Sequence, residues 1–463
     1  MIVMSRAMAR QFRAAARKCC NGRAREPHPE VILKQSGGQL NFTTRFSEVI
    51  LQVEYPIQSE DKTELVVPMS VLDRIEQAKS DRIELHCPKT RNGEARWVES
   101  AIPCSFPVQF QAPSKQHTFP ERPAEFTAVP VNFLKGLHEC GRSADKQDGR
   151  FALSRIQIRG KQGQIVGTDS HIGLLCSGFR LPFTEEVLIP AIPIFGLPDW
   201  QSQEVSVGKT ASHLVVSAGP CTVWLSIVST GRYPDLNSLI PRQSPTIAKI
   251  DVQDASSLLN VLDHLPGVND ENRPVTLDLD EQVKIRSCDS ESGEIREITL
   301  DHSTVAGPSA RHALDRQMLA RVLSLGCHTL RSPVAPEKPL IAEAEGMTFL
   351  VMPLNPDLIV PPTKDANAVC TPTTSLSSLA QRRNDMRPTE QNGRSPIGRT
   401  EPTPSPETVD PLIVAEELRI ALSDATLKAG KLVNMLKSGR KEKKVLASVF
   451  AGLKQLNLNG TQP

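Results

Sequence analysis

The sequence predicts an α+β protein made of three tandem units, with a tail of different composition after them. The first observation is a repeat: three windows share the order of an amphipathic helix, alternating strands joined by a turn, a second helix and further strands. The second is a change after Leu354, where large apolar residues become rare. The third is length, because 463 residues suit about three domains of ordinary size.

Each unit opens with a segment of helical period. These segments are SRAMARQFRAAARKCC (5–20), FTAVPVNFLKGLHECGR (126–142) and VQDASSLLNVLDHLPG (252–267). Second helices are predicted inside the strand-helix-strand patterns at 65–87, 187–207 and 312–332. Alternating residues, as in 151–169, predict paired strands.

The tail divides into two parts. Its first part is rich in Pro, Thr, Ser and Arg and cannot offset the entropy cost of ordering. Helical signals return at Asp410-Pro411, an N-cap followed by a first-turn proline, and a leucine stripe follows. We therefore expect units at 1–115, 116–244 and 245–355, a disordered linker at 356–409 and a helical hairpin or short coiled coil at 410–458.

Charge and cysteine content narrow the class of protein. The 54 basic residues nearly balance the 52 acidic ones, so the whole chain gives no polyanion-binding signal, although residues 1–25 carry seven bases and no acid. Ten cysteines without metal-ligand spacing indicate a reduced cytoplasm, and we expect no metal and no cofactor. No apolar run approaches the length of a membrane span, so no membrane partner is expected.

The Arg-rich N-terminus bears on targeting. It lacks the long apolar core of a secretory signal. A transit peptide has a similar composition, but the fit of this stretch to a first helix favours the helix.

The turn Thr168-Asp169-Ser170-His171 raises the question of an enzyme. Neighbouring residues of a strand or turn point to different sides, so a contiguous Ser-His pair is poor geometry for a nucleophile and its base. Elsewhere the sequence has no nucleophile elbow, phosphate-binding glycine loop or paired metal-ligand motif. We therefore expect a protein that is not an enzyme, and a partly buried, hydrogen-bonded His171.

Three strings resemble motifs of the bacterial sliding clamp, the beta subunit of DNA polymerase III. TGRYPDLNSLIP (230–241) is similar to the family's Gly-Arg-Phe-Pro-Asp signature followed by Leu-Pro, and TFLVMPL (348–354) to its terminal Met-Pro strand. TDSHIGLL (168–175) is similar to its Thr-Asp-Gly-His-Arg-Leu turn. The resemblance covers about residues 5–355 and implies three DNA-clamp domains with helices inside and antiparallel sheets outside.

The resemblance also implies a function. A homodimer, closed head to tail through the edges of the first and third domains, encircles double-stranded DNA and tethers DNA polymerase III at high local concentration. Clamp loader subunits are further expected partners. The alternative is a diverged clamp-like paralogue, a protein-interaction scaffold with weak or no encirclement of DNA, which the tail and an altered pocket favour.

In the family, the TDSH-like turn lines an apolar pocket that captures a short peptide from polymerases, clamp loaders and repair proteins. Carried over to this chain, the pocket residues are Leu153, Thr168, Ser170, His171, Pro241, Ile247, Leu350, Met352 and Pro353. Apolar walls around a few polar groups suit a peptide anchor. Because Ser170, Ile172 and Gly173 replace the family's Gly, Arg and Leu, we expect the loss of a donor and of an apolar wall, with altered peptide specificity.

Candidate DNA contacts combine basic helix positions with positions matched to the family. They are Arg10, Arg13, Arg17, Arg23, Arg74, Lys135, Arg150 and Phe151. The region 189–200 has no base, and 252–265 carries Asp254 and Asp263 without Lys or Arg. A channel lined by these helices is half neutral or acidic, so we expect weak, strongly salt-sensitive duplex binding centred on the helix at 5–20.

The end of the tail carries one more motif. KQLNLNG (454–460) contains Gln455-Leu456-x-Leu458, which is similar to the peptide that clamp partners carry. The same string is also read as the end of an amphipathic helix. The first interpretation predicts that the tail occupies the chain's own pocket.

Overall fold

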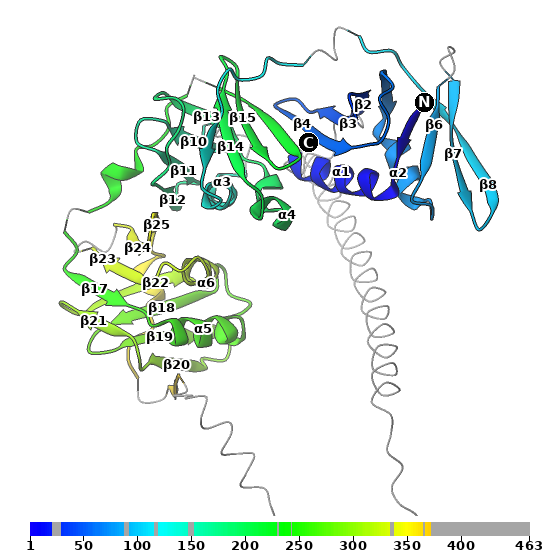
Figure 1. Cartoon of the computed structure of the whole chain (residues 1–463). Coiled ribbons are helices and arrows are strands. Elements are labelled where there is room, and N and C mark those ends of the chain that lie inside the picture. Colours follow the sequence, from blue (N-terminus) through cyan, green and yellow to red (C-terminus); the bar gives the residue numbers. More distant parts are fainter. Residues whose placement is uncertain are drawn as a thin grey trace, which may run out of the picture. The chain divides into compact units, whose positions relative to one another are not determined.

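The computed structural model describes residues 1–20, 29–87, 92–114, 119–146, 152–228, 231–241, 243–333, 338–363 and 366–371 (Figure 1). These residues belong to one compact body, Met1–Ser375, which contains all three repeat units. The expectations for Arg23, Arg150 and Phe151 fall outside the described residues. So do those for the linker after Thr371, for the helical segment at 410–458 and for the peptide-like string at 454–460.

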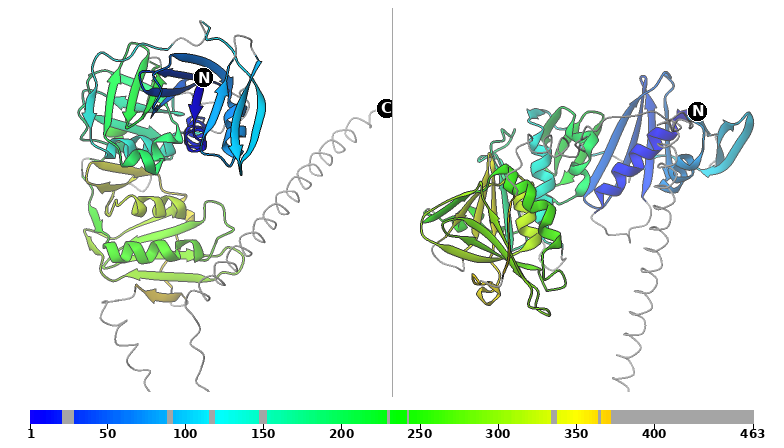
Figure 2. Two further views of the ribbon diagram at one scale, coloured as in Figure 1. Left: turned by 45° about the vertical axis from the view of Figure 1, so that its right-hand side comes forward. Right: turned by 90° about the horizontal axis from the view of Figure 1, so that it is seen from below.

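The first unit packs two helices against antiparallel strands. Helix α1 (Arg6–Cys19) begins after Ser5, whose Oγ accepts a hydrogen bond from the Met8 N–H at 3.1 Å. Helix α2 (Met69–Gln77) lies beside α1 (Figure 2). Both helices confirm the sequence prediction. The strands are β1 (Ile2–Met4), β2 (Glu30–Ser36), β3 (Gln39–Arg45), β4 (Val49–Pro56), β5 (Thr63–Pro68), β6 (Ile83–His86), β7 (Asn92–Glu99) and β8 (Ile102–Gln109).

The second unit departs from the repeat in its helices. Helix α3 (Asn132–Ser143) starts later than predicted, because β9 (Thr127–Val129) pairs with β14. The predicted second helix is only a 3-10 turn, η2 (Pro193–Gly196), and one helical turn, α4 (Pro198–Gln201), since each proline lacks the N–H that a longer helix needs. The other strands are β10 (Arg155–Arg159), β11 (Gln164–Thr168), β12 (Ile172–Cys176), β13 (Glu186–Pro190), β14 (Val205–Lys209), β15 (His213–Ala218) and β16 (Cys221–Ser226).

The third unit has both predicted helices, α5 (Val252–Val261) and α6 (Arg316–Ser324). Asp251 and Asp315 cap them by accepting hydrogen bonds at 2.7 Å from the N–H groups of Gln253 and Gln317. One short 3-10 turn, η3 (Leu236–Leu239), precedes the first strand of this unit, and another, η4 (Leu262–His264), directly follows α5. The strands are β17 (Thr246–Lys249), β18 (Pro274–Leu279), β19 (Val283–Cys288), β20 (Ile295–Leu300), β21 (Thr304–Ala306), β22 (Ala310–Asp315), β23 (Thr329–Ser332), β24 (Leu340–Ala344) and β25 (Met347–Val351).

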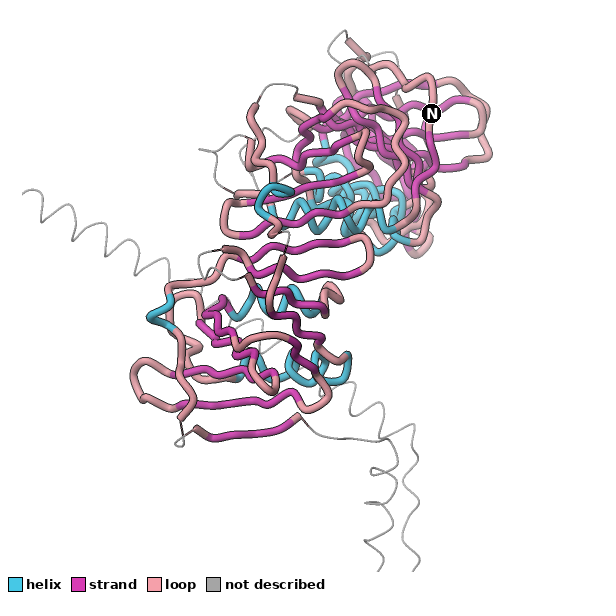
Figure 3. Tube along the Cα trace, turned by 90° about the vertical axis from the view of Figure 1, so that its left-hand side faces the viewer, coloured by secondary structure: helices cyan, strands magenta, loops and turns pink. Residues whose placement is uncertain are grey.

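The described strands form four sheets, two of which are shared between units. Figure 3 shows the strands in magenta and the helices in cyan. Sheet A has the order β1-β6-β7-β8, and sheet B the order β5-β2-β3-β4-β16-β15-β14-β9. Sheet C has the order β13-β10-β11-β12-β25-β24-β23-β17-β21, and sheet D the order β22-β18-β19-β20-β26, where β26 is Asn367–Cys370. Pairing of β4 with β16 joins the first two units, and pairing of β12 with β25 joins the last two. The α+β fold class is confirmed, while the unit boundaries stay predictions.

Sheet C has two apolar faces. Alternate residues of β12 point to opposite sides, so Ile172 and Leu174 join the large core that contains the helices, whereas Leu175 does not. A smaller cluster lies on the side away from the helices. It consists of Val166, Leu175, Leu236, Ile341 and Leu350. We call this side the outer face of sheet C.

The prediction of a disordered linker from residue 356 is wrong for its first part. Residues Pro356–Leu358 form a 3-10 turn, η5, which Asn355 caps by accepting a hydrogen bond from the Asp357 N–H. Residues Asn367–Cys370 form a strand, β26, at the edge of sheet D. Composition alone missed both, because short segments of this kind are ordered by hydrogen bonds to neighbouring structure rather than by their own apolar content.

Candidate functional site

The turn between β11 and β12 uses its polar side chains to close itself. Thr168 Oγ1 donates to the carbonyl of Ile172 at 2.6 Å and accepts from the Ser170 N–H at 3.2 Å. Asp169 Oδ1 accepts from the N–H groups of His171 and Ile172, each at 2.8 Å. Turns closed by Asp side chains in this way are common. The His171 residue is exposed rather than partly buried as predicted.

Ser170 has a backbone conformation that suits glycine. Its φ is +82°, in the region where a side chain costs roughly 1–2 kcal/mol. The family's glycine at this position therefore has a physical reason, and Ser170 retains the turn with strain. We expect Ser170→Gly to stabilise the protein by about 0.5–1 kcal/mol after the greater entropy of unfolded glycine is subtracted. Urea unfolding measures this change, and an equal or lower stability of the glycine variant would contradict the assigned strain.

Residues predicted to line the pocket share a row across the outer face of sheet C. Directly opposed residues of antiparallel strands point to the same side. Successive opposed pairs join Thr168, Gly173, Leu350, Ile341, Arg331 and Ile247. Three strand spacings separate Leu350 from Ile247, or about 14 Å. The structure thus places Thr168, Leu350 and Ile247 on one broad face.

The remaining predicted pocket residues lie at the two ends of this row. At one end, the Met352 N–H donates to the carbonyl of His171 at 2.9 Å, and Pro353 follows. Leu153 is half-buried just before β10. At the other end, Arg331 Nη2 donates to the carbonyl of Pro241 at 3.1 Å and so fixes the loop before Ile247. Met352 and Ile247 are each 37% exposed, which leaves apolar surface available for a ligand at both ends.

Leu236 fills the space opened by Gly173, and sequence reasoning missed it. A Cβ added to Gly173 would lie 2.7 Å from Leu236 Cδ1. The Leu236 side chain is 3% exposed, and Asp235 caps its 3-10 turn through the Asn237 N–H. The apolar wall that the sequence predicts to be missing at Gly173 is therefore supplied by Leu236. The usable signal was the pair itself: a glycine where the resemblance implies leucine, and a leucine in GRYPDL.

Two other neighbours shape this face. Ile172 points to the helix side, so its side chain does not lie on the face with Gly173 and Leu350. Tyr233 packs against the same apolar cluster as Leu236, and its hydroxyl donates to the carbonyls of Arg155 and Val166, both at 3.3 Å. Burial raises the pKa of Tyr233, so this hydroxyl stays a donor at neutral pH.

The predicted DNA contacts on α1 differ in availability. Arg10 is exposed, and the Arg17 side chain is 64% exposed with its guanidinium 3.9 Å from Glu76. Arg13 is 17% exposed and forms ion pairs with Glu76 and, at 2.5 Å, with Asp73 of α2. Arg13 therefore holds α1 to α2, whereas Arg10 and Arg17 remain able to meet a phosphate.

Two further predicted contacts are exposed. The guanidinium carbon of Arg74 on α2 lies 3.9 Å from the ring centroid of Phe106, a cation-π contact that orients the side chain. Lys135 is exposed on α3. The available bases of the described helices thus lie on α1, α2 and α3.

The helices of the third unit present little charge at their surface. Arg316 is 1% exposed and donates to the carbonyls of Leu265 and Pro266 at 2.9 and 2.5 Å. The expectation that Asp254 adds surface charge is wrong, since it is fully buried. Burial raises the pKa of Asp254, but hydrogen bonds from Ser303, His302 and Thr371 outweigh it and hold this pKa below its ordinary value.

A buried ion pair joins α6 to α3. Arg321 Nη2 donates to the carbonyl of Glu139 at 2.7 Å, to Glu139 Oε2 at 3.2 Å and to Ser143 Oγ at 2.9 Å. The Arg321 and Glu139 side chains are 8% and 9% exposed. Its guanidinium carbon also lies 5.2 Å from the centroid of the Phe349 ring. Arg321 is thus a tie between helices rather than a surface cation.

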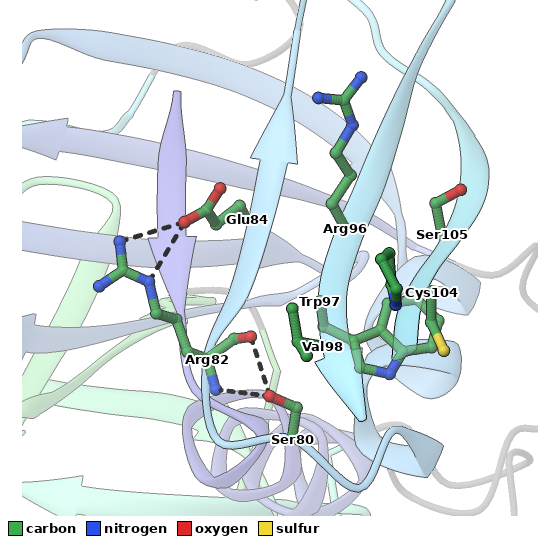
Figure 4. A pocket seen from close by; sticks show the side chains of 9 residues that line it. Ser80, Arg82, Glu84, Arg96, Trp97, Val98, Cys104 and Ser105 are labelled. Atoms are coloured by element: carbon green, nitrogen blue, oxygen red, sulfur yellow. Dashed lines mark hydrogen bonds and ion pairs between the residues drawn. The ribbon is translucent and has the colours of Figure 1, made fainter. Parts of the chain in front are cut away.

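Two hollows lie apart from the outer face of sheet C. The first, about 560 Å³, opens over β6, β7 and β8, where Arg82 binds Glu84 and the side chains of Arg96, Val98 and Ser105 line the wall (Figure 4). The second, about 680 Å³, lies between α1 and the segment of α4 and includes Arg10 and Trp200. The first borders the free edge of sheet A at β8.

Paired helices on antiparallel sheets that continue from unit to unit are the fold of the sliding clamps, so the resemblance is confirmed for the fold. The beta subunit of DNA polymerase III from Pseudomonas aeruginosa is similar at 19% identity, with 76% of this chain and 99% of that chain covered and a TM-score of 0.62. A DnaN sliding clamp of the same organism, bound to griselimycin, has the same identity and coverage and a TM-score of 0.63. A putative DNA polymerase III beta subunit from Eubacterium rectale ATCC 33656 is 12% identical, with the same coverage and a TM-score of 0.64.

Other comparisons add no nearer relative. No protein-family model matches the chain, and the search of curated proteins gives no significant match. Within the described ranges, no helix is long and apolar enough to cross a membrane. The same residues contain no group of three or more His, Cys, Asp or Glu that could hold a metal ion.

Proposed function

We propose that the protein is a non-catalytic sliding clamp that encircles duplex DNA as a head-to-tail homodimer and tethers a DNA polymerase. The observation that supports this most is coverage: the fold match spans 99% of the length of the matched DNA polymerase III beta subunit. In this proposal retention on DNA is topological, so few strong phosphate contacts are needed, and tethering raises the local concentration of the polymerase. DNA polymerase III, clamp loader subunits and a cytoplasmic location belong to the same proposal.

Closure of the ring would pair sheet A of one copy with sheet D of the other, the two sheets that are not shared between units. Sheet A ends at β8, and sheet D would end at β20 without β26. A pairing of β8 from one copy with β20 of the other would repeat the joint that links successive units. The hollow over β6, β7 and β8 would border this joint (Figure 4).

The decisive experiment is loading. Full-length protein, a clamp loader and nicked circular DNA are combined, and polymerase processivity and retention of the protein on the circle are measured. The proposal expects retention that is lost when the circle is linearised. Retention that does not depend on circularity would reject encirclement.

The second candidate is a scaffold with weak or no encirclement, and the sequence of β8 favours it. Pro103 and Pro107 have no N–H and occupy the same side of β8 as Ser105 and Gln109. A proline in an edge strand lies where the backbone N–H would point away from the neighbouring strand. Pro103 and Pro107 therefore lie on the unpaired side of β8. A second copy would thus find fewer donors at β8. Absence of a dimer at high concentration would support the scaffold.

We also propose the outer face of sheet C as the peptide-binding site. A peptide of the Gln-Leu-x-Leu-Phe type is expected to bind there, and the double variant His171→Ala with Met352→Ala should weaken binding about tenfold, because it removes one exposed apolar anchor and the side chain beside it. Fluorescence anisotropy measures the dissociation constant. Val252→Ala, which truncates a more exposed apolar side chain on α5, should leave the dissociation constant unchanged. No saturable binding by the native protein would reject the site.

A further inference from the structure

The chain crosses sheet D after it leaves β25. The Leu354 N–H donates to the carbonyl of Ala313 in β22 at 2.7 Å. The Val360 N–H then donates to Thr276 Oγ1 of β18 at 2.8 Å, and Arg286 Nη1 of β19 reaches the Val360 carbonyl at 3.5 Å. The segment therefore passes β22, β18 and β19 in order before it arrives at β20.

At β20 the segment becomes strand β26. It pairs in parallel, with Arg296, Glu297, Ile298 and Thr299 opposite Asn367, Ala368, Val369 and Cys370. Every other strand pair described in these sheets is antiparallel. Without β26, β20 would be the terminal strand of sheet D, with unpaired backbone groups that invite another strand.

The end of β26 is anchored to the buried carboxylate of α5. The Thr371 N–H donates to the carbonyl of Thr299 at 3.0 Å, and its Oγ1 donates to Asp254 Oδ1 at 2.7 Å. The same Oγ1 accepts from the Asp301 N–H at 3.2 Å. Thr371 is 5% exposed, whereas the four residues of β26 are all exposed, Val369 at 57%. Backbone pairing and one buried threonine therefore hold β26, with little apolar burial.

We propose that β26 is a removable cap on the edge of sheet D, and that it prevents the β8 strand of a second copy from pairing with β20. This inference rests on the proposed head-to-tail assembly. One edge cannot pair with two strands at once, so capping and closure exclude each other. The small apolar area buried by β26 makes the cap displaceable, since most strand stability comes from side-chain packing. Release of the cap thus regulates whether the ring closes.

Backbone geometry supplies a matched pair of variants. Successive N–H groups of a strand point to opposite sides, so the N–H of Val369 points toward β20 as that of Thr371 does, while that of Ala368 points away. Val369→Pro therefore removes a group on the paired side, and Ala368→Pro is the control. Thr371→Val keeps the shape of the anchor and removes its hydroxyl. All three are made in the full-length chain.

Sedimentation velocity gives the dimer dissociation constant. Amide hydrogen exchange at β20, measured at a concentration where the chain is monomeric, reports uncapping. We expect Val369→Pro and Thr371→Val to increase exchange at β20 and to lower the dimer dissociation constant about tenfold, because the capped state no longer competes with the dimer. Ala368→Pro should change neither quantity. Increased exchange with an unchanged dissociation constant overturns the cap, and the ring proposal stands. Increased exchange with no dimer in any variant overturns the head-to-tail assembly and the cap with it.

Discussion

Replacing Arg321 by alanine should lower the free energy of unfolding by about 3 kcal/mol. The reason is that Glu139, 9% exposed, would lose its buried partner, and removal of one member of a buried ion pair commonly costs about 3–5 kcal/mol. Ser143 and the Glu139 carbonyl would lose a donor as well. Urea unfolding followed by circular dichroism measures the change.

The chain offers a matched control at the same carboxylate. Arg142 also binds Glu139, at 3.2 Å, but its side chain is 55% exposed, so Arg142→Ala should cost less than about 1 kcal/mol. The double variant Arg321→Met with Glu139→Leu should recover most of the loss, because no charge is left unpaired. Equal small losses for Arg321→Ala and Arg142→Ala would show that the buried tie contributes little.

Charge reversal at Arg10 and Arg17 should strongly weaken binding to duplex DNA at low ionic strength, while the exposed Arg74 and Lys135 keep some affinity. Both side chains are exposed on α1, while the helices of the third unit present no exposed Lys or Arg in the described residues. Because the variant can no longer neutralise two of the phosphates, the dependence of log affinity on log salt should flatten by about two units. Arg13 is left intact because its loss would separate α1 from α2.

Fluorescence anisotropy with a labelled duplex over a salt series measures this effect. The control is Lys34→Glu with Lys62→Glu, which makes the same change of net charge on exposed residues of the first unit outside its helices. The control should retain most of the binding. If the Arg10 and Arg17 variant binds as the native protein does, α1 does not face DNA, and only the fold of a clamp would remain.

The helices were predictable where their apolar period was continuous. Phe12 on α1 and Leu258 on α5 are buried as the spacing requires. The prediction of a long helix at 189–200 was wrong because two prolines divide the segment. The prediction that a helical segment includes Thr127–Val129 was wrong because these residues pair with β14, and this pairing outweighs the local pattern. These errors arise where tertiary pairing or a missing N–H decides the local structure.

The side chains of the candidate sites were less predictable. In the sequence, Arg13, Arg316 and Arg321 look like surface bases, but each binds a partner more than 50 positions away along the chain. Their burial depends on Asp73, Leu265 and Glu139 arriving at the right place, which no local window encodes. For the same reason, the sequence does not show that the side chain of Leu236 fills the space beside Gly173.

The capped edge was unpredictable in another way. NAVC (367–370) has no alternation and follows a proline-rich run, so nothing local marks it as a strand. Its order comes from the open edge of β20 and from the carboxylate of Asp254. Sequence patterns report what a segment can bury, whereas β26 is held by what its neighbour leaves unpaired.

Continuity of the sheets sets a limit on dissecting this protein. The repeat unit of the sequence does not have a sheet of its own on every side. Strand β16 of the second unit pairs with β4 of the first, and β12 of the second pairs with β25 of the third. Cutting between units would expose two long strand edges on the middle fragment alone, and such edges promote aggregation. A single unit of this kind therefore needs neighbours that cover its strand edges, either in the same chain or in another copy.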